Sequence, residues 1–247
     1  MRTDLPGPRR PGSVLAVLLL AVAMLPACGD DGAGEAATTT TTEAPRSSTT
    51  TEAPTACPDD PAPRGEQRGT PVPLDADGDE AGDEVSVHVR EPGTVEVVVA
   101  HGAGGRSVVE VADENVATFA DVRVATVGDV DADGDDDVWV VVGAGASVEI
   151  ATLVLADGCV PVRAEVDGRG SAFTFGASVG HVAGIECADD GTFRTHEADL
   201  AGETTYRGTT TTWSVGADGS LEQQGQEPLE VDLADPGQAR HTTLDCS

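Results

Sequence analysis

An acidic run directly before an apolar segment constrains this chain more than any other feature. The run is Asp129-Val130-Asp131-Ala132-Asp133-Gly134-Asp135-Asp136-Asp137, and it is followed by Val138-Trp139-Val140-Val141-Val142. Six carboxylates in nine residues repel one another unless a cation lies among them. The apolar segment predicts a buried strand, which would hold one end of the acidic loop in place.

The spacing of the acids within this run predicts a calcium loop. Counting Asp129 as position 1, carboxylates fall at positions 1, 3, 5 and 9, and Gly134 at position 6 can take the positive φ of a sharp turn. Calcium binds about six to eight oxygen atoms, and alternate side chains of a tight loop point inward. An EF-hand does not explain the run, because its bidentate glutamate would stand at position 12, which is Val140 here.

A second copy of the pattern lies upstream and begins at Asp75. Asp75, Asp77, Asp79 and Asp83 repeat the spacing, and the strand-like segment Glu84-Val85-Ser86-Val87-His88-Val89 follows. Glu80 stands at position 6 in place of glycine, so a less regular turn is expected there. A repeat of roughly fifty residues containing about four strands has the length of one propeller blade.

Short β-branched runs separated by Gly, Pro and Asp predict that residues 64 to 247 form an all-β domain. No stretch in this part of the sequence shows a helical period with caps. The expected architecture is antiparallel, in propeller-like blades that are incomplete or open, with a β-sandwich as the alternative. The strands expected from residue 85 onward are Val85–Arg90, Thr94–Ala100, Arg106–Val111, Val122–Val127, Trp139–Val142 and Val148–Leu155.

The segment from Val127 to Gly143 resembles the FG-GAP or VCBS repeat, which is known from the integrin α-chain propeller and from bacterial surface proteins. The segment from Asp75 to Val85 is similar. The resemblance implies one or two calcium ions in loops between blade strands, with a main-chain carbonyl at position 7 as a further ligand. The ligands implied are Asp129, Asp131, Asp133, the main chain of Asp135, and Asp137 in one loop, and Asp75, Asp77, Asp79, the main chain of Ala81, and Asp83 in the other.

The residues after the signal-like N-terminus supply fewer blades than a closed propeller needs. Residues 64 to 247 are long enough for roughly three blades, whereas propellers typically close with about four to eight. The options are shortened blades, an open stack of blade-like sheets capped by the C-terminal strands, or assembly from several chains.

The N-terminus predicts export and lipid anchoring. Residues 1–27 carry arginines followed by the apolar run Val14 to Leu25, as in a signal peptide. Leu25-Pro26-Ala27-Cys28 resembles the lipobox of bacterial lipoproteins, which implies lipidation of Cys28 and a place on the outer face of the cytoplasmic membrane or the cell surface. Residues 28–63 are rich in Thr, Pro, Ala and Glu, and are expected to form a disordered tether.

The charge of the chain excludes some partners. The formal net charge is −30, so neither nucleic acid nor an anionic membrane surface suits the protein, and contact with the membrane is expected through the lipid anchor only. An envelope or extracellular partner is expected, but its identity cannot be deduced from the sequence.

Four cysteines besides Cys28 predict two disulfides, as suits an exported protein. Three connectivities are possible. The pairing we predict joins Cys159 to Cys187 within the domain and Cys57 to Cys246 across its ends.

One catalytic pattern occurs, and it is weak. Gly176-Ala177-Ser178-Val179-Gly180 fits the nucleophile elbow G-x-S-x-G, but the residues after it predict a strand where the elbow requires a helix. The five histidines show no metal-ligand spacing and are expected to be surface or strand residues.

These observations predict a lipid-anchored, calcium-binding β-domain that acts as a binding module and not as an enzyme. The alternatives are an enzyme, or its accessory subunit, that acts on an envelope polymer through a cleft in residues 160 to 247, and a purely structural envelope protein.

Overall fold

The computed structural model describes residues 56–91, 94–112, 122–145 and 147–246. The predicted signal peptide, Cys28 and the tether up to residue 55 lie outside the described residues. The described residues form a single compact unit. Within the part of the chain that the structure describes, no helix has the length and apolar character needed to cross a bilayer.

The domain is all-β, as predicted, and its sheets are antiparallel except where β16 pairs with β12. None of the sheets formed by the described residues closes on itself. The first eight strands are β1 (Glu66–Leu74), β2 (Asp83–Glu91), β3 (Thr94–Ala100), β4 (Arg106–Ala112), β5 (Arg123–Gly128), β6 (Asp137–Ala144), β7 (Val148–Asp157) and β8 (Val160–Arg163). The remaining elements are β9 (Glu165–Val166), β10 (Arg169–Gly170), β11 (Phe173–Ala177), β12 (His181–Ala188), β13 (Thr192–Leu200), β14 (Thr205–Val215), β15 (Leu221–Asp232), the 3₁₀ helix η2 (Pro236–Thr242) and β16 (Leu244–Asp245).

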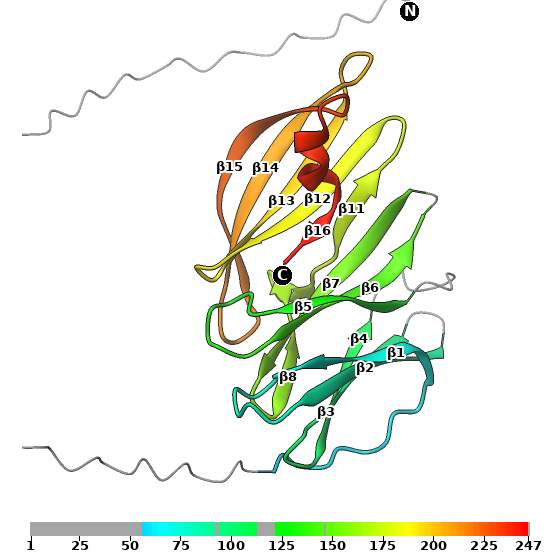
Figure 1. The fold of residues 1–247 in the computed structure, drawn as a ribbon, viewed down its shortest axis with the longest axis vertical. Helices are drawn as coiled ribbons and strands as arrows, with labels where there is room; N and C mark the ends of the chain where they lie inside the picture. Colours follow the sequence, from blue (N-terminus) through cyan, green and yellow to red (C-terminus); the bar gives the residue numbers. More distant parts are fainter. Residues whose placement is uncertain (1–55, 92–93, 113–121, 146, 247) are drawn as a thin grey trace, which may run out of the picture. The chain divides into compact units, whose positions relative to one another are not determined.

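Three β-layers follow one another along the domain (Figure 1). The first is the meander β1-β2-β3-β4, and the second is β5-β6-β7-β8. The third is β12-β13-β14-β15, which is joined to the second through β11, because β11 pairs with both β7 and β12. The helix η2 packs beside β12, where a side chain at Gly184 would collide with the main chain of His241.

Strand β6 lies between two hydrophobic cores, which explains its unbroken apolar sequence. Val138, Val140 and Val142 face the first layer and pack with valines of β2 and β3. Trp139 faces the third layer and forms edge-to-face contacts with Phe173 and Phe193, at centroid distances of 5.9 and 5.4 Å. A strand buried on both faces reads as a continuous apolar run, since neither face can carry polar residues.

The first two layers repeat one another with a constant offset along the chain. Strands β2, β3 and β4 begin at Asp83, Thr94 and Arg106, and their counterparts β6, β7 and β8 begin at Asp137, Val148 and Val160. Each pair of starting residues has the same separation in sequence, which is also the separation between Asp75 and Asp129. The ends of β1 and β5, at Leu74 and Gly128, keep this offset too. The spacing seen in the acidic loops therefore extends over two whole four-stranded units.

The predicted pairing of the cysteines is wrong. The disulfides join Cys57 to Cys159 and Cys187 to Cys246. The prediction assumed that the ends of the domain meet, but the residues around Cys57 hydrogen-bond to the β3–β4 turn in the first layer, whereas β16 pairs with β12 in the third. The disulfides close loops with separations of 102 and 59 residues, and in the chain-entropy picture each would contribute about 4 to 5 kcal/mol.

Candidate metal centre in two paired acidic loops

The two acidic loops occupy equivalent places in the first two layers. The first loop (residues 75–82) connects β1 to β2, and the second loop (residues 129–136) connects β5 to β6. Each loop ends at an aspartate that begins the next strand, so the position-9 side chain is held on a buried, hydrogen-bonded frame.

Position 9 fastens each loop to its own sheet. Asp83 accepts hydrogen bonds from the main-chain N–H groups of Ala76 (2.9 Å) and Gly102 (2.7 Å). Asp137 accepts the equivalent pair from Val130 (2.9 Å) and Ala156 (3.0 Å). Both aspartates are 1% exposed. Asp83 therefore ties the start of its loop to the turn after β3, and Asp137 ties the start of its loop to β7.

The turns of the two loops also match, although their glycines do not. Positions 4 and 6 have positive φ in both loops: Gly78 (64°) and Glu80 (60°) in the first, Ala132 (63°) and Gly134 (103°) in the second. The turn expected to be irregular at Glu80 thus has the same backbone as its counterpart. In each loop the N–H at position 6 donates to the position-1 carboxylate, at 3.2 Å.

The structure brings together three predicted carboxylates in each loop. Oxygens of Asp75, Asp77 and Asp83 lie within 4.8 Å of one another, and so do oxygens of Asp129, Asp131 and Asp137. Each set could hold a metal ion. The position-5 aspartates lie outside these sets; Asp79 and Asp133 accept hydrogen bonds from the N–H of Ala81 and Asp135, at 2.6 and 2.9 Å, and so close the turn.

Several carboxylate oxygens in the loops are buried without a hydrogen-bond partner. They are Oδ1 of Asp75, Oδ2 of Asp79 and Oδ1 of Asp131. Buried polar atoms are normally paired, because an unpaired one loses its hydration and gains nothing in return. The donor set is carboxylate oxygen, which suits a divalent cation.

The two loops contact each other. The N–H of Asp136 donates to the carbonyl of Asp75 (2.6 Å), and the N–H of Asp75 donates to the Asp136 carboxylate (3.0 Å). A side chain at Gly78 would meet the carboxylate of Asp135. The loops therefore form one acidic region, in which the charges of Asp75 and Asp77 in the first loop help to raise the pKa of Asp135 in the second.

The electrostatics of this region disfavour ionised carboxylates. Burial, followed by the charges of Asp131 and Asp133, raises the pKa of Asp137 to about 7 against the pull of its two N–H donors. Burial and the neighbouring Asp133 raise the pKa of Asp131 to about 6. Burial likewise raises the pKa of Asp77 and of Asp135. A bound cation would offset these costs, since it favours the charged form of every carboxylate around it.

The second loop opens on a hollow at the junction with the third layer. The hollow has a volume of about 420 Å³, and Asp129, Glu186, Asp189 and Asp245 line it. It gives an ion a route from solvent to the exposed carboxylate of Asp129.

One histidine lies where the sequence did not place it. His101 follows the end of β3 and is buried, at 6% exposure, although a surface or strand position was expected. His196 is a strand residue of β13, as predicted, and is buried at 3% exposure. His101 lies 3.6 Å from Asp77 and 3.7 Å from Asp83, measured from Nδ1 to the carboxylate oxygens. A comparison of the repeats could have found it, because the residue at the equivalent position of the second repeat is the apolar Leu155.

The G-x-S-x-G pattern lies on a β-hairpin. Ser178 stands in the turn between β11 and β12, and its hydroxyl donates to the main-chain carbonyl of His181 (3.2 Å). The strand–turn–helix geometry of a nucleophile elbow is not formed at these residues.

A further hollow lies in the C-terminal part of the chain. It has a volume of about 970 Å³ and extends over β13 and β14. Its lining includes the indole of Trp213, the hydroxyl side chains of Thr195, Thr209 and Thr211, and the amide of Gln226. Charged side chains line it too, namely Asp167, Arg169, Glu197, Asp199 and Arg207.

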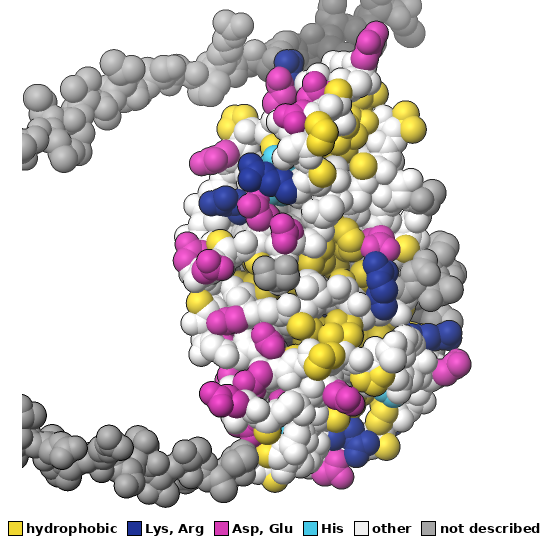
Figure 2. All heavy atoms as spheres, in the orientation of Figure 1, with side chains coloured by type: hydrophobic (Ala, Val, Ile, Leu, Met, Phe, Trp, Pro, Cys, Tyr) yellow, Lys and Arg dark blue, Asp and Glu magenta, His cyan; other side chains and the backbone are white. Residues whose placement is uncertain are grey.

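Figure 2 shows one face of the molecule, on which acidic side chains are spread widely and basic ones are few. No protein-family model matches the chain, and neither a curated protein nor a solved structure matches it.

Proposed function

We propose that this protein is an exported, calcium-stabilised β-domain that acts as a binding module at the cell surface. The observation that carries the proposal is the pair of acidic loops with one geometry, each containing buried carboxylate oxygens that lack a partner. Clustered carboxylates with raised pKa values destabilise the fold at neutral pH unless a cation neutralises them.

Calcium is the ion that the second loop suits best. Its candidate ligands are all oxygens, from Asp129, Asp131 and Asp137, and the resemblance to the FG-GAP repeat adds the main-chain carbonyl of Asp135. Hard cations such as calcium prefer this donor set and tolerate irregular geometry. The equivalent oxygens of the first loop come from Asp75, Asp77 and Asp83, with the carbonyl of Ala81.

We also propose that the first two layers are blade-like units of the FG-GAP or VCBS type. Their constant offset in sequence and the place of each loop between the first two strands of a four-stranded meander support this interpretation. The first two layers then represent an open stack of such units, and the third layer, in whose described residues no acidic loop of this kind occurs, follows them.

The proposed binding face is the hollow over β13 and β14. Hydroxyl, amide and charged groups beside an indole ring suit a hydroxyl-rich polymer, since such a ligand offers many hydrogen bonds and flat apolar faces. Export through the N-terminal segment and lipidation at Cys28 would present this face to envelope material outside the cell.

The stability test compares melting temperatures in calcium, magnesium and chelator for three proteins. These are the wild type, Asp131→Asn, and the charge-matched control Asp157→Asn, whose carboxylate is exposed outside the loops. At a calcium concentration of about ten times the dissociation constant, each site adds about 1.4 kcal/mol, or a shift of about 3 to 6 °C. The shift should shrink in Asp131→Asn and persist in Asp157→Asn. A wild-type melting temperature indifferent to calcium and chelator would overturn the proposal.

A second function, an enzyme or accessory subunit acting on an envelope polymer, is favoured by the size of the same hollow and by the His181–Asp199 contact of 3.0 Å at its edge. Binding is tested by a pull-down of envelope fractions with the immobilised wild-type protein and with Trp213→Ala. Weaker capture by Trp213→Ala would support the proposed binding face. Turnover on a panel of glycan and ester substrates would instead establish the enzyme.

A further inference from the structure

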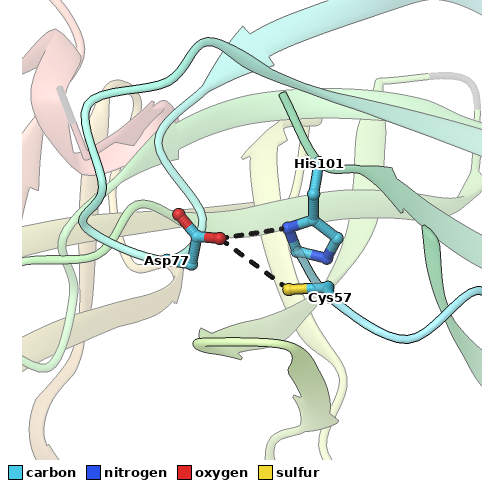
Figure 3. A group of neighbouring side chains, drawn as sticks. All are labelled: Cys57, Asp77 and His101. Atoms are coloured by element: carbon cyan, nitrogen blue, oxygen red, sulfur yellow. Dashed lines mark hydrogen bonds and ion pairs between the residues drawn. The ribbon is translucent and has the colours of Figure 1, made fainter. Parts of the chain in front are cut away.

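The first loop differs from the second in having a histidine against its carboxylates. His101 follows β3 directly, and its side chain is 1% exposed. Its Nδ1 atom lies 3.6 Å from Oδ2 of Asp77 and 3.7 Å from Oδ2 of Asp83 (Figure 3). This nitrogen has no hydrogen-bond partner among the described residues.

The hydrogen bonds on the other side of the ring determine which nitrogen carries the proton. Ser107 Oγ lies 2.6 Å from the carbonyl oxygen of Cys159, which can only accept, so the hydroxyl proton belongs to that bond. Ser107 Oγ must then accept the hydrogen bond from His101 Nε2, at 2.9 Å. A neutral His101 therefore carries its proton on Nε2.

The remaining nitrogen, Nδ1, then directs a bare lone pair toward two carboxylates. Two acceptors facing each other in a buried site repel, and the arrangement becomes favourable only when a positive group lies between them. Metal-binding histidines show this arrangement: one ring nitrogen binds the ion, and the other donates to a fixed oxygen that sets the ring orientation.

We propose that the first loop is a mixed nitrogen and oxygen site that binds a borderline transition metal such as zinc, through Nδ1 of His101 and the carboxylates of Asp77 and Asp83. Asp75 lies close enough to add a further oxygen. Imidazole with carboxylates suits zinc, whereas calcium prefers oxygen alone. The inference rests only on the first loop holding a cation, and it is independent of calcium in the second loop.

The two separations between Nδ1 of His101 and the carboxylate oxygens fit such an ion. Two ligand atoms at about 2.1 Å from a tetrahedral zinc lie about 3.4 Å apart. The observed separations of 3.6 and 3.7 Å from Nδ1 need only a small movement of the side chains. Cys57 Sγ also lies near, at 3.8 Å from Asp77 Oδ2 (Figure 3), but it is bonded to Cys159 and offers no thiolate.

The second loop supplies the internal comparison. The residues equivalent to His101 and Ser107 are Leu155 and Pro161, neither of which can bind an ion or orient a ligand. His101→Leu therefore converts the first site to the chemistry of the second. Ser107→Ala removes only the orienting oxygen, so Ser107 is a positioning residue in this proposal.

The test is zinc and calcium titration of the disulfide-bonded protein by calorimetry, together with the ¹⁵N chemical shifts of the His101 ring. In the wild type we expect zinc to bind with the Nδ1 resonance moving to the position of a metallated nitrogen while Nε2 stays protonated. His101→Leu should lower the zinc affinity by more than the roughly 10- to 100-fold expected for Ser107→Ala, which removes an outer partner. Calcium binding at the second loop should be unchanged in both.

Three outcomes would overturn the proposal. If Nδ1 of His101 is protonated at pH 7 and its chemical shift does not change with zinc, the ring is a counter-ion of the two carboxylates and not a metal ligand. Zinc affinity unchanged in His101→Leu would place the metal elsewhere, and calcium displacing zinc at equal concentration would remove the selectivity. If His101→Leu fails to fold, the test rests on the ¹⁵N chemical shifts of the wild-type His101 ring and on the zinc affinity of Ser107→Ala. The calcium binding of Asp131→Asn tests the proposed function at the second loop. It does not test the zinc site in the first loop.

Discussion

The first and second acidic loops share the same backbone turns and hydrogen-bonded frame but differ in chemistry. Both turn through positive φ at positions 4 and 6, and both are fastened by a position-9 aspartate with two N–H donors. They differ in what surrounds that frame: His101 against Leu155, Gly82 against Asp136, and glycine at position 4 against glycine at position 6. The features that the loops share are those required for the loop to fold. The features that differ are candidates for determining which ion each loop binds.

The largest expected effect comes from breaking the frame that the loops share. Asp83→Ala and Asp137→Ala each leave two main-chain N–H groups without their acceptor in a buried site. We expect each substitution to lower the free energy of unfolding by about 3 to 5 kcal/mol, measured by urea denaturation. Asp129→Ala, at an exposed position of the same loop, is the control and should cost much less in chelator. Equal losses for all three would show that position 9 has no special role.

The next effect is a pH dependence that comes from the second loop. The pKa of Asp137 is raised to about 7, so without metal the folded state binds its proton more tightly than the unfolded state does. This contribution to stability is complete below about pH 4 and is lost as the pH rises through 7. A shift of this size corresponds to about 4 kcal/mol.

The measurement is the difference between wild type and Asp137→Asn in chelator over this pH range, because Asn does not titrate. The lowered pKa values of His196 and His241, caused first by burial, make stability rise with pH up to about 6.5 and should cancel in that difference. Saturating calcium should flatten the wild-type curve. A difference that grows in favour of the wild type as pH rises would contradict the prediction.

A smaller effect concerns the contact between the loops. Asp136 accepts a hydrogen bond from the N–H of Asp75, while its counterpart in the first loop, Gly82, has no side chain. Asp136→Ala should therefore cost about 1 to 2 kcal/mol, because one half-buried N–H loses its partner. Thermal unfolding measures the cost. The same change at exposed Asp157 should have little effect, and equal costs at both sites would argue against the contact.

The smallest effect comes from introducing or removing glycine at the positions of positive φ in the two loops. Glu80 and Ala132 have φ near +60°, which costs a residue with a Cβ about 1 kcal/mol relative to glycine. Glu80→Gly and Ala132→Gly should each raise the melting temperature by a few degrees at most. Gly134→Ala, at φ 103°, should lower it. If all three changes lowered it, backbone strain would not explain the choice of residue at these positions.

Much of the fold could be predicted from the sequence, because its signals are local. Short β-branched runs predicted β2 to β7, and the acid spacing located both loops together with the strand after each of them. The continuous apolar run after Asp137 indicated burial, although not that β6 has a hydrophobic core on each face. That fact depends on how layers stack, which no local pattern contains.

The features that the sequence did not reveal all depend on contacts between distant segments. The cysteine pairing follows from which layer each end of the chain enters, so the prediction that Cys57 meets Cys246 was wrong. His101, at the end of β3, meets Asp77 in the loop before β2, and its partner Ser107 is oriented by Cys159 in the next layer. Aligning the two repeats would have flagged His101, because a polar residue there replaces the buried Leu155.

The position of β6 between two cores has a consequence for the time scale on which the domain opens. Solvent cannot reach the amides of Val138 to Val142 through fraying of an edge, because β5 and β7 flank the strand and a layer covers each face. These amides should exchange with deuterium only when the whole domain unfolds. Their exchange rates would therefore report global stability directly, and adding an ion that binds either loop should slow all of them together.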